Sequence, residues 1–417
     1  MRQLIDDCFY FNKPLITAGE ALEMLKTRLG PIIESETVSL SDSVGRILAE
    51  NIIAPNSIPR FDNSAVDGYA FRHRDLNPNK ITKLKIIGKI AAGHPTKGST
   101  NIREAWRIFT GAPIPFELDT VIMQEDCERV GNYISVPPKV SLGMNRRKAG
   151  EDINKDDVFL HKGQKLQAPH IAQAAAISRK KLKVFKPLRV ALFSSGDEIL
   201  DVGEKLRDGC IFDSNRYSIN ALLLSLGCKV QDLGILPDHR KDIEKALEIA
   251  AECYDVIMTS AGVSAGEEDH IRGAVEALGS LYFWRLAIRP GRPLAFGQIK
   301  KTPFIGLPGN PAAGIVTFMQ FARPALLLLG GAKYTKPLHF QVPAHFSYRK
   351  KAGRREWIGV SLKINEQGIS EAHKFSKNGA GILSPLVKSD GLIDLPENLT
   401  KIEPGTIVNF IPFSEVT

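Results

Sequence analysis

The segment 255–311 brings together groups that recognise phosphate. An apolar run typical of a buried parallel strand is followed by a glycine-rich turn, whose backbone N–H groups can approach a phosphate closely. The candidate ligand residues of this turn are Gly262, Ser264 and Gly266. Glu268 and Asp269 follow directly, and their carboxylates are the oxygen ligands that a hard divalent cation such as Mg²⁺ prefers. The segment therefore predicts an anion cradle beside a cation site.

Three arginines further along the same segment suit an oxyanion. The two-residue period of a strand places Arg285 and Arg289 on one face, and Arg292 lies past the Pro-Gly turn that ends this strand. Guanidinium groups bind phosphate or another tetrahedral oxyanion through two parallel hydrogen bonds. The alternative is a charged strand face that contacts only solvent.

A short run at the start of a predicted helix, 312–329, completes this segment. The run is Pro308, Gly309 and Asn310, followed by Pro311. Asparagine is a favoured helix cap and proline a favoured first residue of a helix. Capping alone explains the pattern, and a functional interpretation adds an anion at the helix N-terminus.

Acidic side chains also follow two earlier predicted strands. Glu198 comes after the strand 189–193, and Asp238 comes after the next strand along the chain. Because the carboxyl ends of parallel strands meet at one edge of a sheet, these carboxylates would join Asp269 and repel it unless a cation lies between them. The predicted metal ligands are Glu198, Asp238, Glu268 and Asp269. Each of these acids taken singly is also consistent with a solvated loop residue.

Small polar residues near these acids are further candidates for binding substrate. Ser195 and Gly196 lie in the turn before Glu198, where a hydroxyl and a backbone amide can bind phosphate. Asp213 and Asn215 precede a predicted helix, where helix capping is the ordinary alternative.

The elements that must position these residues divide the chain into several units. Strands and helices alternate over 186–331, which is typical of βαβ units in a three-layer α/β/α domain. Amphipathic helices predicted at 17–29 and 168–178 are expected to pack together. The predicted fold class is α/β multidomain. The predicted domains are a discontinuous α-containing linker domain (14–50 and 149–185), a β-rich insert (51–148), the three-layer domain (186–331) and a C-terminal β domain (336–417).

Length and composition exclude several classes of protein. The chain has 417 residues, which is too long for a single hydrophobic core of typical size. Its 55 Lys and Arg against 46 Asp and Glu give a net charge of +9. The basic residues are scattered, which favours a small anionic substrate over nucleic acid. Five cysteines without C-x-x-C spacing indicate buried free thiols. No apolar run approaches the roughly 20 residues that span a bilayer, and a signal peptide pattern is absent, so we expect a cytoplasmic protein with no membrane partner.

Two polar motifs lie in the predicted insert. Residues 61–69 read Phe-Asp-Asn-Ser-Ala-Val-Asp-Gly-Tyr, and residues 110–115 read Thr-Gly-Ala-Pro-Ile-Pro. Both compositions favour tight turns with hydrogen bonds from side chains to the backbone, so a structural role alone would explain them.

Together these motifs resemble those of the molybdopterin molybdenumtransferase family, which includes MoeA and the E domain of gephyrin. The matching motifs occur in order over nearly the whole chain, at 61–69, 110–115, 150–152, 195–198, 260–269, 288–293 and 306–311. The resemblance implies an enzyme that takes adenylylated molybdopterin and molybdate, uses Mg²⁺ or another divalent cation, and releases AMP. It also implies a MogA-like three-layer domain, a β-barrel-like C-terminal domain, and a homodimer with its active site between one subunit's three-layer domain and the partner's insert.

Carried over to this chain, the resemblance assigns roles to individual residues. The catalytic residues that it implies are Asp67, Thr110, Glu198, Asp238, Asp269, Arg285 and Arg289. Asp152 matches a further acid of the family and would contact substrate. Arg354 and Ser384 match the arginine and the serine that bind molybdate. Arginines replace lysines that are common at 285, 289 and 292 in bacterial members, which preserves the charge but changes the geometry.

Two other functions fit parts of the pattern. A scaffold protein that anchors receptors would use the same fold, as the animal relatives do, but the intact set of Glu198, Asp238 and Asp269 favours catalysis. A molybdopterin adenylyltransferase would need only the three-layer domain, and it would leave the motif at 61–69 unexplained.

Overall fold

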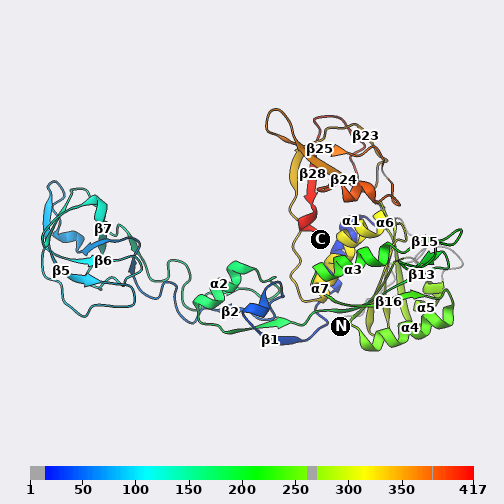
Figure 1. The fold of residues 1–417 in the computed structure, drawn as a ribbon, viewed down its shortest axis with the longest axis horizontal. Helices are drawn as coiled ribbons and strands as arrows, with labels where there is room; N and C mark the ends of the chain where they lie inside the picture. The colour runs from blue at the N-terminus through cyan, green and yellow to red at the C-terminus, as the bar shows by residue number, and fades with distance from the viewer. Residues whose placement is uncertain (1–14, 261–269, 378) are drawn as a thin grey trace.

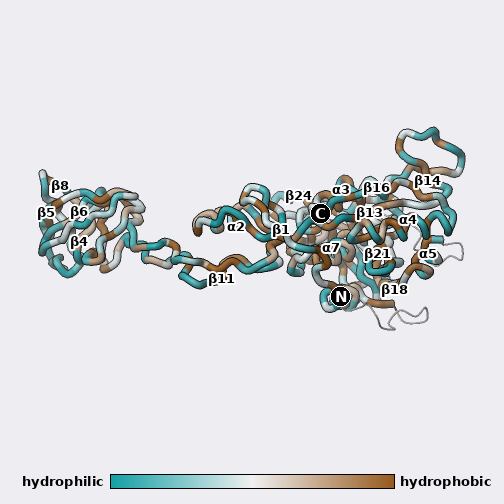
Figure 2. Tube along the Cα trace, turned by 90° about the horizontal axis from the view of Figure 1, so that it is seen from below, coloured by the Kyte–Doolittle hydropathy of each residue, from teal (hydrophilic) through white to brown (hydrophobic). Residues whose placement is uncertain are grey.

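The computed structural model describes residues 15–260, 270–377 and 379–417 of an elongated protein. A β-rich insert lies at one end, a small middle unit follows, and the three-layer domain and the C-terminal domain form the other end (Figure 1). A view turned by 90° shows the insert equally separate from the rest of the chain (Figure 2). The predicted α/β multidomain class is confirmed.

The insert is built on a six-stranded sheet in the order β7-β4-β6-β5-β9-β8. Its strands are β4 (Gly68–Phe71), β5 (Thr82–Ile90), β6 (Glu104–Ile108), β7 (Thr120–Met123), β8 (Glu128–Val130) and β9 (Tyr133–Val136), with a separate pair of β3 (Asn63–Ser64) and β10 (Arg146–Arg147). Successive side chains of β4 point to opposite faces, so Ala70 packs in one apolar cluster while Tyr69 and Phe71 pack in another. The insert therefore has apolar side chains on both faces of its sheet.

The middle unit joins two distant parts of the sequence. Its elements are β1 (Ser35–Ser39), β2 (Ile52–Ile53), β11 (Val158–Leu160), α2 (Ala168–Ala176) and β12 (Lys181–Phe185). Strand β1 pairs with β12, and β2 pairs with β11. Leu48, Leu160 and Val184 are fully buried in its core, together with Ala174 of α2. This small core holds the two chain segments that lead to and from the insert.

Helix α1 (Ala18–Arg28) does not belong to that core. Its buried residues Ala21 and Leu25 pack instead in the core of the three-layer domain, against helix α7 (Arg323–Leu329). The expectation that the first helix packs on the helix at 168–178 is therefore wrong. An amphipathic pattern requires an apolar partner for the helix, and here the leucine-rich α7 supplies it.

Thr17 caps α1, as the sequence predicts, and forms a capping box with Glu20. A Thr17→Ala variant is expected to lower the free energy of unfolding by about 1 kcal/mol, because the backbone N–H of Glu20 loses its acceptor. Urea denaturation followed by circular dichroism measures the change. Thr27 is the matched control, since its exposed hydroxyl contacts only carbonyls within the helix, and Thr27→Ala is expected to change stability by less than about 0.5 kcal/mol. Equal effects of the two variants would contradict a role for the cap.

The three-layer domain contains a six-stranded sheet in the order β16-β13-β17-β21-β20-β18. The first four strands of this order are parallel, and β20 and β18 run antiparallel to their neighbours. The strands are β13 (Arg189–Ser195), β16 (Lys229–Leu236), β17 (Val256–Ser260), β18 (Gly279–Arg285), β20 (Pro293–Ile299) and β21 (Thr302–Leu307). A short pair, β14 (Ile199–Leu200) and β15 (Ile211–Phe212), extends from the edge where β13 ends.

Helices cover both faces of this sheet. The helices are α3 (Asn215–Ser225), α4 (Arg240–Cys253), α5 (His270–Leu278) and α6 (Pro311–Thr317), with α1 and α7. Val190 and Leu192 of β13 face α1, α3, α6 and α7, whereas Ala191 and Phe193 face α4 and α5. The alternating apolar residues of a central strand thus bury both faces of the sheet.

The predicted helix at 312–329 is continuous but irregular. Helix α6 passes through a π-helical stretch, η4 (Phe318–Ala322), into α7. Among the described helices, Pro311–Leu329 is the one that is long and apolar enough to cross a membrane, contrary to the expectation that no segment reaches this length. Its most apolar window is 72% buried inside the fold, as in the core helix of a soluble domain.

The cysteines differ in their exposure. Among those that the structure describes, Cys127, Cys210, Cys228 and Cys253 are free thiols. Cys228 is buried, and burial raises its pKa to about 12, whereas Cys253 is exposed. The expectation of buried thiols therefore holds for Cys228 but not for Cys253.

The C-terminal domain has a sheet in the order β19-β24-β26-β28-β22, and β25 also pairs with β24. Its elements are β19 (Ile288–Arg289), β22 (Phe340–Pro343), β23 (Tyr348–Arg349), β24 (Arg355–Ile364), β25 (Ser370–Lys374), α8 (Ser384–Val387), β26 (Gly391–Leu395), β27 (Lys401–Ile402) and β28 (Ile407–Pro412). Strand β19 comes from the three-layer region of the sequence, so this sheet ties the two domains together.

The prediction that Arg285 and Arg289 share one strand face is wrong. Strand β18 ends at Arg285 in the three-layer sheet, and Arg289 lies in β19, which pairs with β24 of the C-terminal domain. Between them, Leu286 forms a bridge to Ile16, next to α1. The alternation of residue types cannot reveal that the chain leaves one sheet for another within four residues.

Candidate active site

The carboxyl ends of four parallel strands meet at one edge of the three-layer sheet. Ser195 pairs with Leu236, and Ser194 of the same strand pairs with Ser260, which pairs in turn with Leu307. The strands β13, β16, β17 and β21 therefore end side by side. Because ligands of open α/β sheets bind outside the carboxyl ends of the strands, this edge is the candidate active site.

Buried hydroxyl groups mark the last residues of these strands. Ser194, Thr259 and Ser260 are at most 1% exposed. Their side-chain oxygens have no hydrogen-bond partner among the described residues. A buried polar group without a partner is unfavourable and usually signals a bound group or a functional role. Sequence patterns did not predict that these three hydroxyls bind ligand. The pattern that could have identified them is a serine or threonine at the end of an apolar strand.

Glu198 and Asp238 both lie just beyond strand ends at this edge. Glu198 is exposed and Asp238 is half-buried. The Glu198 carboxylate folds back over Gly196, where an added Cβ would lie 2.5 Å from Glu198 Oε2. The backbone φ of Gly196 is 137°, a conformation that favours glycine. Gly196 thus lets the Glu198 side chain lie over the end of β13 beside Ser195.

The Gly-Asn-Pro turn is held next to the start of α3. Asn215 donates a hydrogen bond from Nδ2 to the carbonyl of Gly309, at 2.7 Å, and its Oδ1 is buried without a partner among the described residues. Asn310 is the N-cap of α6, but its side chain makes no capping hydrogen bond. The backbone N–H of Ala313 donates to the carbonyl of Ala380 at 3.1 Å, so the C-terminal domain contacts the start of this helix.

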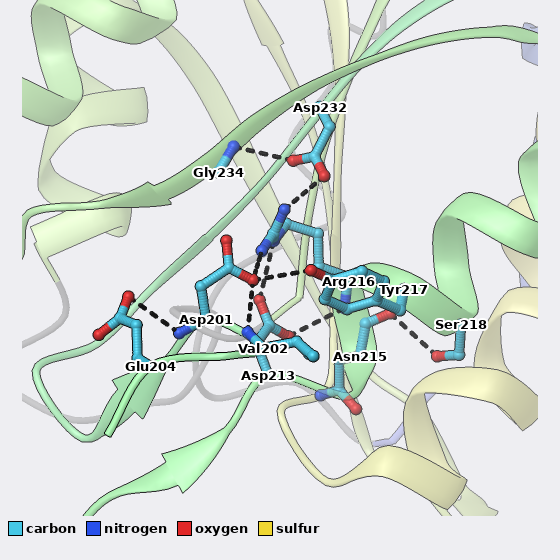
Figure 3. Close-up of polar contacts among 10 residues, drawn as sticks. All are labelled: Asp201, Val202, Glu204, Asp213, Asn215, Arg216, Tyr217, Ser218, Asp232 and Gly234. Carbon is cyan, nitrogen blue, oxygen red and sulfur yellow. Dashed lines mark hydrogen bonds and ion pairs between the residues drawn. The ribbon is translucent and has the colours of Figure 1, made fainter. Parts of the chain in front are cut away.

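Asp213, which the sequence predicts to bind substrate, has hydrogen-bond partners within the chain. Its Oδ1 accepts from the backbone N–H of Arg216 and its Oδ2 from Arg216 Nε, both at 3.0 Å. The same guanidinium donates to Asp201 at 2.6 Å and to Asp232 (Figure 3). Arg216 and Asp213 are 3% and 4% exposed. These carboxylates raise the pKa of Arg216 against the opposing effect of burial. The network joins the start of α3, the end of β14 and strand β16 beside the candidate site.

A second cluster of charges lies where the C-terminal domain meets the three-layer domain. Glu356 is 1% exposed, and its Oε1 lies 3.1 Å from Arg354 Nη2 in an ion pair. Tyr348 donates to Glu356 Oε2 at 2.7 Å, and Arg289 Nη1 lies 3.9 Å from the same oxygen. Burial and the bond to Glu356 raise the pKa of Tyr348 to about 12, so the phenol stays protonated. A cavity of about 60 Å³ lies against Arg289, Tyr348 and Glu356.

Sequence patterns did not identify Tyr348 or Glu356, because neither belongs to a motif whose spacing indicates a binding site. Arg354 forms an ion pair with Glu356. The Nε atom of Arg354 is buried without a hydrogen-bond partner among the described residues. Ser384 begins α8 and is exposed, and Arg292 is exposed in the turn beside α6. The assignment of Arg354 and Ser384 to molybdate stays a prediction.

Several predicted residues lie outside the described part of the chain. These are Gly262, Ser264, Gly266, Glu268 and Asp269, and the side chain of Arg285. The strand that leads into this segment, β17, and the helix that follows it, α5, are both described.

Asp67 and Thr110 come together in the insert. Asp67 Oδ1 accepts hydrogen bonds from the backbone N–H and from the hydroxyl of Thr110, both at 2.8 Å. These two bonds, with help from the nearby Arg107, lower the pKa of Asp67. Gly68 must be glycine, since an added Cβ would lie 1.9 Å from the carbonyl oxygen of Ile122. Two motifs distant in sequence therefore form one ionised site.

The insert pair lies far from the sheet edge of the same chain. Asp67 precedes β4 and Thr110 follows β6, and both views place these strands at the opposite end of the molecule from β13 (Figures 1 and 2). Asp152 is exposed where the middle unit continues into the insert, and its backbone N–H donates to Ile58. The structure thus brings the predicted residues together in separate groups.

Comparison with known proteins covers almost the whole chain. Residues 16–178 match the MoeA N-terminal region (domain I and II), residues 191–327 match the probable molybdopterin binding domain, and residues 341–413 match the MoeA C-terminal region (domain IV). A molybdopterin molybdenumtransferase of Haemophilus influenzae is 37% identical over 404 residues, which cover 96% of this chain and 100% of the relative. One from Nostoc is 33% identical and covers 89% of this chain and 87% of its own.

Solved structures agree with the sequence comparison. The crystal structure of the molybdopterin biosynthesis MoeA protein from Pyrococcus horikoshii superimposes with a TM-score of 0.79 at 30% identity. The match covers 96% of this chain and 100% of the Pyrococcus chain. The similarity therefore extends over all the units described above.

Proposed function

This chain belongs to the MoeA family of molybdopterin molybdenumtransferases, and we propose that it inserts molybdate into adenylylated molybdopterin with release of AMP. The family resemblance predicted from the motifs is confirmed, and the protein is a transferase of molybdenum cofactor biosynthesis. We also propose that the molybdopterin substrate is adenylylated, that the reaction uses a divalent cation, and that the protein is a cytoplasmic homodimer.

The observation that carries the proposal is the composition of the sheet edge. Two carboxylates, Glu198 and Asp238, lie just beyond strand ends at this edge, where the hydroxyls of Ser194 and Ser260 are buried without a hydrogen-bond partner among the described residues. The helix start at Asn310 follows the neighbouring strand β21. Hydroxyls, backbone N–H groups and a helix N-terminus bind phosphate oxygens, and carboxylates bind a cation that neutralises them. Such an edge suits a substrate that contains a phosphoanhydride.

The donor set at this edge fits Mg²⁺. The carboxylates of Glu198 and Asp238 have no hydrogen-bond or ion-pair partner in the part of the chain that the structure describes, so their oxygens are available. We propose that both hold the cation, with Glu268 and Asp269 as further ligands. When bound, Mg²⁺ would withdraw charge from the phosphoanhydride oxygens.

The residues of the chain supply the remaining parts of the site. Asn215 holds Gly309 in place, so that the start of α6 faces the substrate phosphates. We propose that Arg289 and Arg292, both exposed, neutralise the charge that develops as AMP leaves. Molybdate is the second substrate, and we propose that it approaches Arg354 and Ser384 at the boundary with the C-terminal domain.

The insert completes the site from a second subunit. Asp67 precedes β4 and Thr110 follows β6, and these strands lie at the far end of the chain from β13, which ends just before Glu198, so one chain alone does not bring these residues together. We propose a homodimer in which the insert of each subunit covers the sheet edge of its partner, as closed twofold assemblies allow.

The test of the proposed reaction is AMP release by the purified protein from adenylylated molybdopterin, Mg²⁺ and molybdate. Removal of Mg²⁺ with EDTA is expected to stop the release, and added Mg²⁺ is expected to restore it. Glu198→Gln, which keeps the size of the side chain but removes its charge, is expected to slow release about 100-fold. Glu248→Gln is the control, because Glu248 pairs with Lys300 at the opposite edge of the sheet. The proposal would be overturned if the unmodified protein released no AMP, or if EDTA did not change the rate of AMP release.

A further inference from the structure

Two histidines and a glutamate converge in the C-terminal domain, away from the candidate active site. They are His345, Glu371 and His373, and each offers a ligand atom within 4.8 Å of the others. His373 pairs with Ser361, well along β24 from the buried Glu356 that contacts Arg354. None of the proposed steps uses this cluster.

The fold builds the cluster from two neighbouring chain segments. Glu371 and His373 are two residues apart in β25, so their side chains point to the same face of the sheet. His345 lies beside them because its backbone N–H donates to the carbonyl of Ala372 at 2.9 Å, and Ala344 forms a bridge to the same residue. The position of all three side chains is thus set by backbone pairing.

The distances suit a single cation. His345 Nδ1 lies 3.1 Å from Glu371 Oε2, and His373 Nε2 lies 4.0 Å from the same oxygen. In a tetrahedral zinc site, with bonds of about 2.0–2.2 Å, ligand atoms are about 3.3–3.5 Å apart. The two imidazole rings are stacked, with centroids 4.4 Å apart and planes 26° from parallel. All three ligand atoms lie within 4.8 Å of one another, close to the separations that a shared cation requires.

A neighbouring amide orients the carboxylate. Asn365 Nδ2 donates to Glu371 Oε1 at 2.9 Å, which leaves Oε2 to face the histidines. Asn365 is itself held in the turn before β25, where its Oδ1 accepts from the backbone N–H groups of Gln367 and Ile369, both at 3.0 Å. Ligating carboxylates in metal sites are usually oriented by such outer hydrogen bonds.

From this geometry we propose that His345, Glu371 and His373 bind a divalent transition-metal ion, with zinc as the expected occupant. Two imidazoles and one carboxylate are a ligand set for Zn²⁺, Ni²⁺ or Cu²⁺ rather than for Mg²⁺, which requires oxygen ligands. Three protein ligands leave a fourth position for water. More than half of the His345 side chain is exposed, at 59%, so the ion can enter from solvent.

The test is a zinc titration of the full-length protein after chelation and dialysis, in competition with a chromophoric zinc chelator. The unmodified protein is expected to bind one more zinc ion per chain than His345→Ala, His373→Ala or Glu371→Gln, each of which lowers the affinity of this site at least about 10-fold. X-ray absorption at the zinc edge is expected to show two histidine ligands. His94→Ala is the control, because His94 is exposed in the insert and its ring contacts only the carbonyl of Ala92.

The variants His345→Ala and Glu198→Gln distinguish this cluster from the acidic sheet edge as the place where zinc binds. His345 lies outside a strand and is mostly exposed, so His345→Ala is expected to fold even if a change in β25 does not. Equal zinc binding by the unmodified protein and His345→Ala would overturn the site. Zinc binding that is lost in Glu198→Gln but kept in His345→Ala would show that zinc occupies only the acidic sheet edge, and would also overturn it.

Discussion

Asp67→Asn is expected to slow AMP release at least about 100-fold, although Asp67 precedes β4 of the insert, which lies far from β13 and the adjoining Glu198 in the same chain. Its carboxylate is kept ionised by two hydrogen bonds from Thr110, so it presents a fixed negative charge. Asparagine keeps the shape of the side chain but removes the charge. Because Asp67 is only half-buried and the Asn side-chain oxygen can still accept both hydrogen bonds from Thr110, we expect the variant to fold, which circular dichroism would confirm.

Mixing this variant with Glu198→Gln distinguishes a shared site from a site within one chain. If each site takes Asp67 from one subunit and Glu198 from the other, a mixed dimer contains one intact site. After unfolding and refolding of an equal mixture, half of the dimers are mixed, so activity is expected to return to roughly one quarter of the unmodified level. The measurement is the rate of AMP release at saturating substrate.

The controls for this experiment are the two variants refolded separately, each of which is expected to stay nearly inactive. If both residues acted within one chain, every chain in the mixture would carry a damaged site, and mixing would restore nothing. That outcome would refute the proposed composite site while leaving the AMP-release reaction itself intact.

Removing Arg216 is expected to have the largest effect on stability. Arg216 and Asp213 are almost fully buried, and the guanidinium holds three carboxylates around the start of α3 (Figure 3). An Arg216→Met variant would leave Asp213 buried without a charge partner, which costs about 3–5 kcal/mol when one member of a buried ion pair is removed. Asp201 and Asp232 are partly exposed and can be rehydrated, so we expect a value at the lower end of this range. Urea unfolding monitored by circular dichroism measures the loss.

Two comparisons isolate the buried charge as the cause. Arg216→Met combined with Asp213→Asn is expected to be more stable than Arg216→Met alone, because the orphaned charge is gone. Arg240→Gln removes an exposed ion pair with Glu244 and is expected to cost less than about 1 kcal/mol. If the double variant were as unstable as the single one, packing of the Arg216 side chain rather than charge would explain the loss.

The periodicity of apolar residues in the sequence was sufficient to predict most strands and helices of the three-layer domain. Alternating apolar runs and amphipathic helices over 186–331 predict parallel strands, and parallel strands end at a shared edge for reasons of geometry alone. The shared edge of Ser195, Glu198, Asp238 and the turn at Asn310 follows from that rule, and the strand register places their strand ends side by side. Local rules of this kind succeed because they depend on neighbours in the sequence.

The predictions that failed depended on which surfaces meet. Helix α1 needed an apolar partner, and its pattern could not show that α7 rather than α2 provides one. The alternation around Arg289 is the same whether the chain continues in one sheet or crosses to another, as it does at β19. Residue type alone also could not show that Asp213 forms hydrogen bonds with Arg216, and its assignment to substrate stays a prediction.

By itself, the sequence determined the family, the α/β multidomain class and the strand-end turns that carry acidic and polar side chains, because these depend on residue type and spacing along the chain. Only the tertiary structure decided that Asp67 joins Thr110 at a distance from Glu198, that Glu356 is buried between Arg354 and Tyr348, and that two histidines flank Glu371. These contacts join residues whose separation in sequence carries no periodic signal. They arise when apolar faces are buried and backbone pairing brings distant segments together.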